Sequence, residues 1–119
     1  MTTSLQEGPV ILIGYEYRLQ LQAEADLFPD GASFAGQMRS AISATGVLAD
    51  VSSAAGSVRR VDDRTLEIIL APAVTVALVP GSVVLDLVRT DLTPDRHLGF
   101  LLEIPVVLPV TRLPASGEL

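Results

Sequence analysis

Few residue types in this chain could carry chemistry, and its single histidine, His97, comes first among them. A serine nucleophile needs a histidine base and a carboxylate, so His97 and Asp86 would have to meet one of the serines in the fold. The sequence contains no G-x-S-x-G motif to present such a serine on a sharp turn. With one histidine and no cysteine, metal sites built from His or Cys ligands are excluded by count. The sequence therefore predicts that His97 is a surface residue beside a turn.

Carboxylates are the next candidates, because calcium sites are cages of carboxylate oxygens at a fixed spacing. The pair Asp62-Asp63 and the group Asp91, Asp95 and Glu103 lack the D-x-D-x-D-G spacing of such a cage. Adjacent acidic residues in a loop are more often solvated turn residues. We therefore expect no metal site.

An enzymatic activity would need other groups that the sequence supplies poorly. Glu16 and Glu24 form a glycosidase pair only if the fold brings them together by chance. The glycine loops that hold phosphates, GxGxxG and GxxxxGK[ST], are both missing. The sequence accordingly predicts no enzyme, no cofactor and no small-molecule substrate.

The composition limits the kinds of partner. The 119 residues carry 14 Asp and Glu against 8 basic residues, all arginine, for a net charge of -6. Only Arg59 and Arg60 are adjacent, and Asp62-Asp63 follow, so nucleic-acid binding through a cation cluster is not expected. Hydrophobic residues make up 49% of the chain, aromatic ones only 4%, and the mean hydropathy is +0.47. Two explanations stay open: an alanine-rich, lysine-poor genome, or apolar surface that other subunits cover.

A membrane location is not expected either. The N-terminal stretch MTTSLQEGPV lacks the basic start and the long apolar segment of a signal peptide. The longest uncharged run, residues 68–85, contains Pro72 and Pro80, which divide it into pieces too short for a span of about 20 residues.

Alternation with a period of two is the main structural signal. In YEYRLQLQA, residues 15–23, the odd-numbered residues from Tyr15 to Leu21 share one apolar face, as in a half-buried strand. We interpret Tyr15 and Tyr17 as large core residues; the alternative is an aromatic contact for a partner or a sugar. A second strand is predicted over 33–42, after a Pro-Asp-Gly turn.

Further short strands follow between turn residues, and we predict them over 47–54, 57–61, 64–70, 82–90 and 97–108. Residues 72–79, PAVTVALV, begin with proline and permit one or two helical turns. The turn DLTPDR joins the last two strands into an antiparallel hairpin. Both strands are partly apolar on both faces, which indicates a central position or a covering subunit.

The predicted fold class is all-β. We expect one domain, 1–119, built as an antiparallel β-sandwich of Ig-like or jelly-roll-like type with about seven or eight short strands. Residues 1–8 and 113–119 are expected to be flexible tails.

The order of these segments resembles a group of small β-sandwich proteins of tailed phages and prophages. In particular it is similar to the N-terminal domain of the baseplate upper protein that carries receptor-binding fibres. The resemblance depends on GYEYRLQLQ, PDGASFAGQMRS, RTLEIILA, AVTVALVPG, SVVLDLVRTD and LLEIPVVLPVTR, and covers about residues 8–112. Val83 departs from it, since related sequences tend to carry an aromatic residue there. No further domain follows Thr111-Arg112, which leads us to expect a stand-alone protein.

The resemblance implies a structural role: an oligomeric component of a tail, baseplate or neck, or an attachment module. Such a protein is made in the bacterial cytoplasm and located in the virion, and its implied partners are other virion proteins and copies of itself. The contact surface is expected on the strands 82–90 and 97–108 and on the segment 9–13. The expected contact residues are Val10, Ile11, Leu12, Ile13, Val84, Val88, Phe100, Leu102 and Ile104.

Two other functions stay open. An Ig-like binding module for a carbohydrate or protein ligand would show an exposed aromatic platform, which a chain without tryptophan supplies poorly. A small enzyme would need a concave pocket with converging polar groups.

Overall fold

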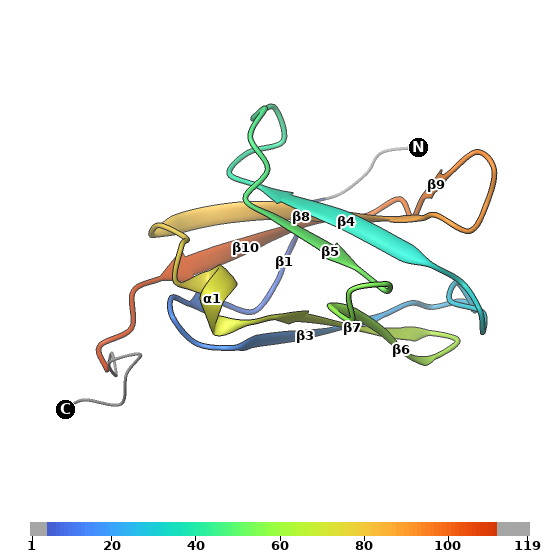
Figure 1. Ribbon diagram of the computed structural model, residues 1–119, viewed down its shortest axis with the longest axis horizontal. Coiled ribbons are helices and arrows are strands. Elements are labelled where there is room, and N and C mark those ends of the chain that lie inside the picture. Colours follow the sequence, from blue (N-terminus) through green and yellow to red (C-terminus); the bar gives the residue numbers. More distant parts are fainter. Residues whose placement is uncertain (1–4, 112–119) are drawn as a thin grey trace.

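The computed structural model describes residues 5–111, which form strands in two layers that face each other (Figure 1). In chain order the elements are β1 (Leu5–Glu7), β2 (Ile11–Leu12), β3 (Tyr17–Gln22), β4 (Phe34–Arg39), β5 (Ala49–Ser52), β6 (Val58–Asp62), β7 (Thr65–Leu70), α1 (Pro72–Thr75), β8 (Gly81–Arg89), β9 (Arg96–His97) and β10 (Leu101–Val107). The prediction of a mostly β chain is confirmed. The described part contains more strands than predicted. The sequence pattern does not resolve β1, β2 and β9 as separate strands, because they have only two or three residues each.

The larger sheet has the strand order β1-β10-β8-β4-β5, with β2 also paired to β10 and β9 to β8. β1 and β2 run parallel to β10, whereas β8 runs antiparallel to its neighbours β10 and β4. The sheet is therefore mixed, and the prediction of a purely antiparallel arrangement is wrong. Alternation along a strand reports which face is buried and does not report the direction of the neighbouring strand.

The smaller sheet has the order β3-β7-β6 and is antiparallel throughout. β3 pairs with β7 along its whole length, from Tyr17 opposite Leu70 to Gln22 opposite Thr65. The odd-numbered residues of β3 are buried or half-buried, and the even-numbered ones are exposed. The strand predicted over 15–23 is thus confirmed, with narrower bounds.

One apolar core fills the space between the sheets, built from aliphatic residues of both and from Phe28 and Phe34 in edge-to-face contact at a ring distance of 5.7 Å. Tyr17 belongs to this core, as predicted, and its hydroxyl donates to the carbonyl of Pro9 at 2.7 Å. Burial raises the pKa of Tyr17 to about 12. Tyr15 is only half-buried, so of the two tyrosines only Tyr17 is a core residue.

β8 lies inside the larger sheet between β10 and β4, which explains why it is apolar on both faces. The odd-numbered residues from Val83 to Leu87 lie in the core, whereas Val84 and Val88 lie half-buried on the outer face. The predicted hairpin is confirmed, but its second strand is divided: β9 pairs with the end of β8 and β10 with its beginning. The division falls where Gly99 adopts a φ of 85°.

The segment for which a helical turn was predicted forms the short helix α1. Its Thr75 is fully buried, accepts a hydrogen bond from the backbone N–H of Gly14 at 3.1 Å and donates one to the carbonyl of Tyr15 at 2.8 Å. These bonds attach α1 to the connection between β2 and β3.

The N-terminal residues that the structure describes are not a free tail. Leu5–Glu7 pairs in register with Leu101–Glu103 of β10, and the N–H of Gly8 donates to the carbonyl of Glu103 at 2.9 Å. The predicted N-terminal tail is therefore wrong from residue 5 onward, because the backbone groups at the edge of β10 find hydrogen-bond partners in this segment. The predicted C-terminal tail lies outside the described residues.

Candidate interaction surface

The single histidine does not form a catalytic triad. His97 is exposed on β9, its Nε2 lies 2.7 Å from a carboxylate oxygen of Asp86, and its Nδ1 lies 2.8 Å from the backbone N of Gly99. Because Nδ1 accepts the Gly99 N–H, the ring proton is assigned to Nε2, which donates to Asp86. Both ring nitrogens are thus engaged, and neither is free to take a proton from a serine. His97 is a surface residue beside the hairpin turn, as predicted.

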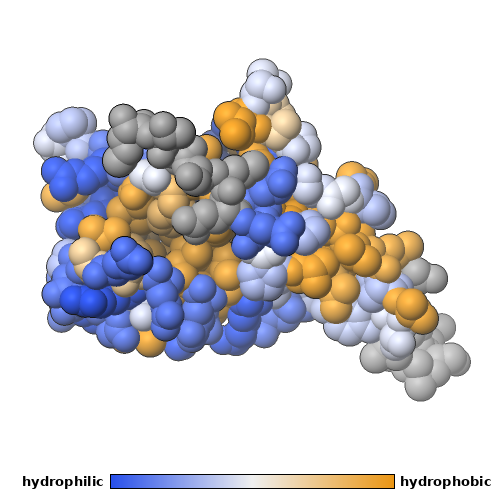
Figure 2. Space-filling model, turned by 180° about the vertical axis from the view of Figure 1, so that it is seen from behind, coloured by the Kyte–Doolittle hydropathy of each residue, from blue (hydrophilic) through white to orange (hydrophobic). Residues whose placement is uncertain are grey.

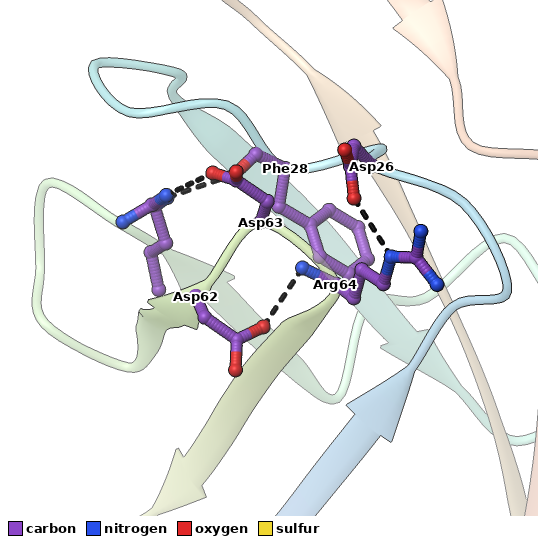
Figure 3. Close-up of polar contacts among 6 residues, drawn as sticks. Asp26, Phe28, Asp62, Asp63 and Arg64 are labelled. Carbon is purple, nitrogen blue, oxygen red and sulfur yellow. Dashed lines mark hydrogen bonds and ion pairs between the residues drawn. The ribbon is translucent and has the colours of Figure 1, made fainter.

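The acidic pair at the turn between β6 and β7 is bonded to neighbouring groups (Figure 3). Asp62 accepts the backbone N–H of Arg64 at 2.8 Å, and this hydrogen bond is the main reason why the pKa of Asp62 lies below its ordinary value. Asp63 binds the guanidinium of Arg60, which also donates to the carbonyl of Phe28 at 2.8 Å. Both carboxylates therefore shape the turn, as predicted.

A second ion pair ties the loop after β3 to the same turn. Arg64 Nε donates to Asp26 at 2.7 Å (Figure 3). The shallow hollow beside this pair is lined by Gln22, Ala23, Asp26, Asp62, Asp63, Arg64 and Thr65. The charged residues of that lining are bonded to groups of the turn itself, so the hollow presents no convergent free charge to a ligand.

The remaining acidic residues that the structure describes do not assemble a site. Asp91 accepts hydrogen bonds from the Arg89 guanidinium at 3.1 and 2.6 Å and from the backbone N–H of Ser33, and the Arg89 bond is the main cause that lowers the pKa of Asp91 to about 2. Within residues 5–111, no three His, Asp or Glu side chains lie close enough together to hold a metal ion. Glu16 and Glu24 flank β3, so about 26 Å of extended chain separates them. That is far more than the roughly 5–10 Å between the carboxylates of a glycosidase.

The end of β10 and the beginning of β8 lie at one end of the molecule (Figure 1). Several residues of the segments that meet there are exposed and aliphatic. Leu12 is the strand partner of Val107, and Gly81 is the partner of Val106, which brings Val79 beside the continuation of β10. The same end appears as an apolar area on the right of Figure 2. We call these residues the terminal patch: Val10, Leu12, Val76, Val79, Val107, Leu108 and Val110.

The side chains of the terminal patch are well exposed. Val79 is 74% exposed and Val110 97% exposed. Single exposed aliphatic residues are common on proteins, but several of them at one end of a molecule are typical of a contact site.

The predicted contact residues lie partly in the core and partly on the surface. Four of them have side chains at most 9% exposed in the protein's own core: Ile11, Ile13, Leu102 and Ile104. These side chains are not available to a partner, contrary to prediction, because alternate residues of β2 and β10 point inward.

The other predicted contact residues lie on three separate parts of the surface. Val10 and Leu12 belong to the terminal patch. Val84 and Val88 lie on the outer face of the larger sheet, and Phe100 lies half-buried next to the end of β3.

Most of the terminal patch was not predicted from the sequence. A signal was present in VVLPV, residues 106–110, since alternation places Val107 on the opposite face from the core residue Val106. The apolar run then continues past the last residue of β10, where none of the strands that the structure describes pairs with it.

Within the part of the chain that the structure describes, no helix is long and apolar enough to cross a membrane. The chain matches no family model, no curated protein and no solved structure.

Proposed function

We propose that this chain is a non-enzymatic structural protein of a tailed bacteriophage or phage-like particle. It is located in the virion, as an oligomeric part of the tail, baseplate or neck or as an attachment component. In this proposal the two facing sheets form a β-sandwich of Ig-like or jelly-roll-like type. The protein works by binding other virion proteins and copies of itself, without a cofactor, nucleic acid or membrane.

The terminal patch is the observation that supports this role most directly. Its members are aliphatic and come from three parts of the chain: residues 10–12 at β2, the connection from α1 to β8, and residues 107–110 at and after the end of β10. Permanent assemblies bury surfaces of this kind, and their interfaces are more apolar than the rest of a protein surface. We infer the kind of assembly from the order of the sequence segments, which resembles that of phage baseplate proteins.

The arrangement of the polar residues supports a role without catalysis. His97, Asp62, Asp63 and Asp91 each hold a neighbouring backbone or side-chain group. A catalytic site instead needs a nucleophile, a base and a stabilising donor that converge on one reacting atom.

An Ig-like binding module receives less support. Tyr17, Phe28 and Phe34 are buried in the core, and they are three of the chain's five aromatic residues. A sugar-binding platform needs aromatic rings that are open to solvent.

Purified particles test the proposed function. The chain is expected in particles isolated from a lysate of the source culture, in a fixed ratio to the major structural protein, as measured by quantitative mass spectrometry. Particles that lack the chain although the lysate contains it would overturn the proposal.

Two matched substitutions test the terminal patch itself. Val107 and Val61 are strand residues with 45% and 46% exposure, and only Val107 belongs to the patch. We expect Val107→Glu to reduce incorporation into particles about 10-fold, the effect of losing one well-packed contact. Val61→Glu is expected to leave incorporation unchanged. Equal incorporation of the two variants would remove the patch from the proposal.

A further inference from the structure

None of the described strands pairs with the outer edge of β3. The N–H of Ala23 donates to the carbonyl of Arg64 at 2.8 Å, so in this antiparallel register the odd-numbered residues of β3 exchange hydrogen bonds with β7. The N–H and C=O groups of Arg18, Gln20 and Gln22 therefore point away from β7. Within residues 5–111 these backbone groups have no hydrogen-bond partner.

The other sheet edges carry features that hinder pairing with a further strand. β6, at the opposite edge of the smaller sheet, has a register shift between Arg60 and Asp62, and charged residues fill three of its five positions. β5 has four residues, and β1 has three with Pro9 soon after it. β3 has six residues, no proline and a continuous register. An edge of this kind accepts another strand readily.

An apolar groove lies beside the same edge. It has a volume of about 460 Å³ between the end of β3 and the segment before β10, and Leu21, Leu27, Leu98 and Phe100 line it. Seen from behind, apolar residues lie open in the middle of the molecule between hydrophilic borders (Figure 2). A strand laid along β3 presents every second side chain to this groove. One extended segment can thus form hydrogen bonds with the open backbone edge and place its side chains in the apolar groove.

We propose that β3 of a second copy of this chain binds this edge in an antiparallel orientation, so that the two smaller sheets join into one. Gln20 of each copy exchanges backbone hydrogen bonds with Gln22 of the other. Leu21 contacts Leu21 of the second copy on the groove side, where Leu98 and Phe100 cover the contact. Arg18, whose Nε donates to Glu16 of its own copy at 2.9 Å, lies opposite Glu24 of the second copy on the outer face. The dimer has two-fold symmetry, so the Arg18–Glu24 contact occurs twice.

The charges select this register. Only the even-numbered residues present hydrogen-bonding groups at the edge, so even-numbered residues of the two copies face each other. A register with Gln20 opposite itself leaves Arg18 facing Gln22, which gains no charge pairing. A register with Arg18 opposite itself places like charges together, which is destabilising. A register with Gln22 opposite itself places Arg18 opposite Asp26, whose carboxylate already binds Arg64. The proposed register instead pairs Arg18 with Glu24 at both ends, and this charge complementarity of the strand with itself favours a second copy as the partner.

The dimer surface is separate from the terminal patch, so the inference goes beyond the proposed function and can fail independently of it. The dimer is measured on the purified chain alone. The proposed function is measured by the presence of the chain in particles.

A proline substitution tests the edge. Gln20→Pro removes an N–H group that points away from β7 and leaves the bonds to β7 intact, whereas Gln20→Ala keeps that N–H and serves as the matched control. Native mass spectrometry is expected to show dimers for the full-length natural chain and for Gln20→Ala, and monomers for Gln20→Pro, with the same circular dichroism for all three. A dimer that survives Gln20→Pro with its fold intact overturns the inference. So does a natural chain that is monomeric at every concentration.

A charge exchange tests the register even if the proline variant fails to fold. Arg18→Glu places like charges opposite each other and is expected to weaken the dimer about 10-fold, and the addition of Glu24→Arg is expected to restore it. In the natural dimer the amides of Gln20 and Gln22 are expected to exchange slowly with solvent, and to exchange rapidly once the dimer is diluted to monomers. A double variant as weak as Arg18→Glu, or protection of these amides only when a different virion protein is added, overturns the second copy as the occupant.

Discussion

Gly36 on β4 lies so close to β8 that no side chain fits between them. A Cβ atom at this position would lie 2.2 Å from the carbonyl oxygen of Asp86 and 2.6 Å from Cδ2 of Leu87. We expect Gly36→Ala to lower the free energy of unfolding by about 3 kcal/mol, the cost of forcing an extra methyl group into a packed site. Urea denaturation followed by circular dichroism measures this change.

Gly46 supplies the control for that substitution. A Cβ there meets no atom within 4 Å, so Gly46→Ala is expected to change stability by less than about 0.5 kcal/mol. If the two alanine variants unfold at the same urea concentration, β4 and β8 do not approach as closely as described.

A residue's role could be predicted from the sequence where it depends on position along one strand. Tyr17 alternates with charged neighbours in β3 and is buried as that alternation indicates. The constraint on Gly36 depends on Asp86 and Leu87, which are distant in sequence, and the pattern of β4 alone does not reveal them. For the same reason the sequence predicts Ile11 and Ile13 as contact residues, because their apolar run does not show that β2 joins the larger sheet with these side chains in the core.

At the scale of the elements, Thr75 holds α1 to the connection between β2 and β3. Its hydroxyl accepts the N–H of Gly14 and donates to the carbonyl of Tyr15 in a fully buried position. Thr75→Val keeps the shape but leaves these two backbone groups without a partner, so we expect a loss of about 2 kcal/mol in the free energy of unfolding. Thr75→Ser keeps the hydroxyl and is expected to lose less. A Thr75→Ser variant that loses as much as Thr75→Val or more, measured by thermal unfolding, would show that the hydroxyl is not the main stabilising group at this junction.

The strands themselves could be predicted, but their neighbours could not. Alternation and turn residues located the longer strands to within a few residues. The parallel partners of β10 and the division between β9 and β10 depend on which edges meet in space, and no local pattern specifies this. Strands as short as β1 and β2 also carry too few residues to show a period.

The terminal patch belongs to the scale of the whole molecule. None of its three contributing segments is unusual by itself, because each is a short apolar run at the end of an element. They form a surface only when the pairing of β2 and β8 with β10 brings them to one end. The sequence indicated excess apolar surface through its mean hydropathy of +0.47, but it could not locate that surface.

The sequence alone predicts a flexible tail over residues 1–8, whereas the structure places Leu5–Glu7 in the larger sheet as β1. Truncation tests whether β1 stabilises that sheet. A chain that begins at Leu5 keeps β1, whereas a chain that begins at Pro9 loses β1 and the bond from Gly8 to Glu103. We expect only the shorter chain to melt lower, by at least about 5 °C, because each backbone hydrogen bond is worth about 1 kcal/mol net and that free energy shifts the melting temperature of a small domain by about this much. The edge of β10 at Leu101–Glu103 is then uncovered, so static light scattering is also expected to rise with concentration. If both truncated chains melt and scatter alike, the pairing of β1 adds no stability and the sheet is complete at β10.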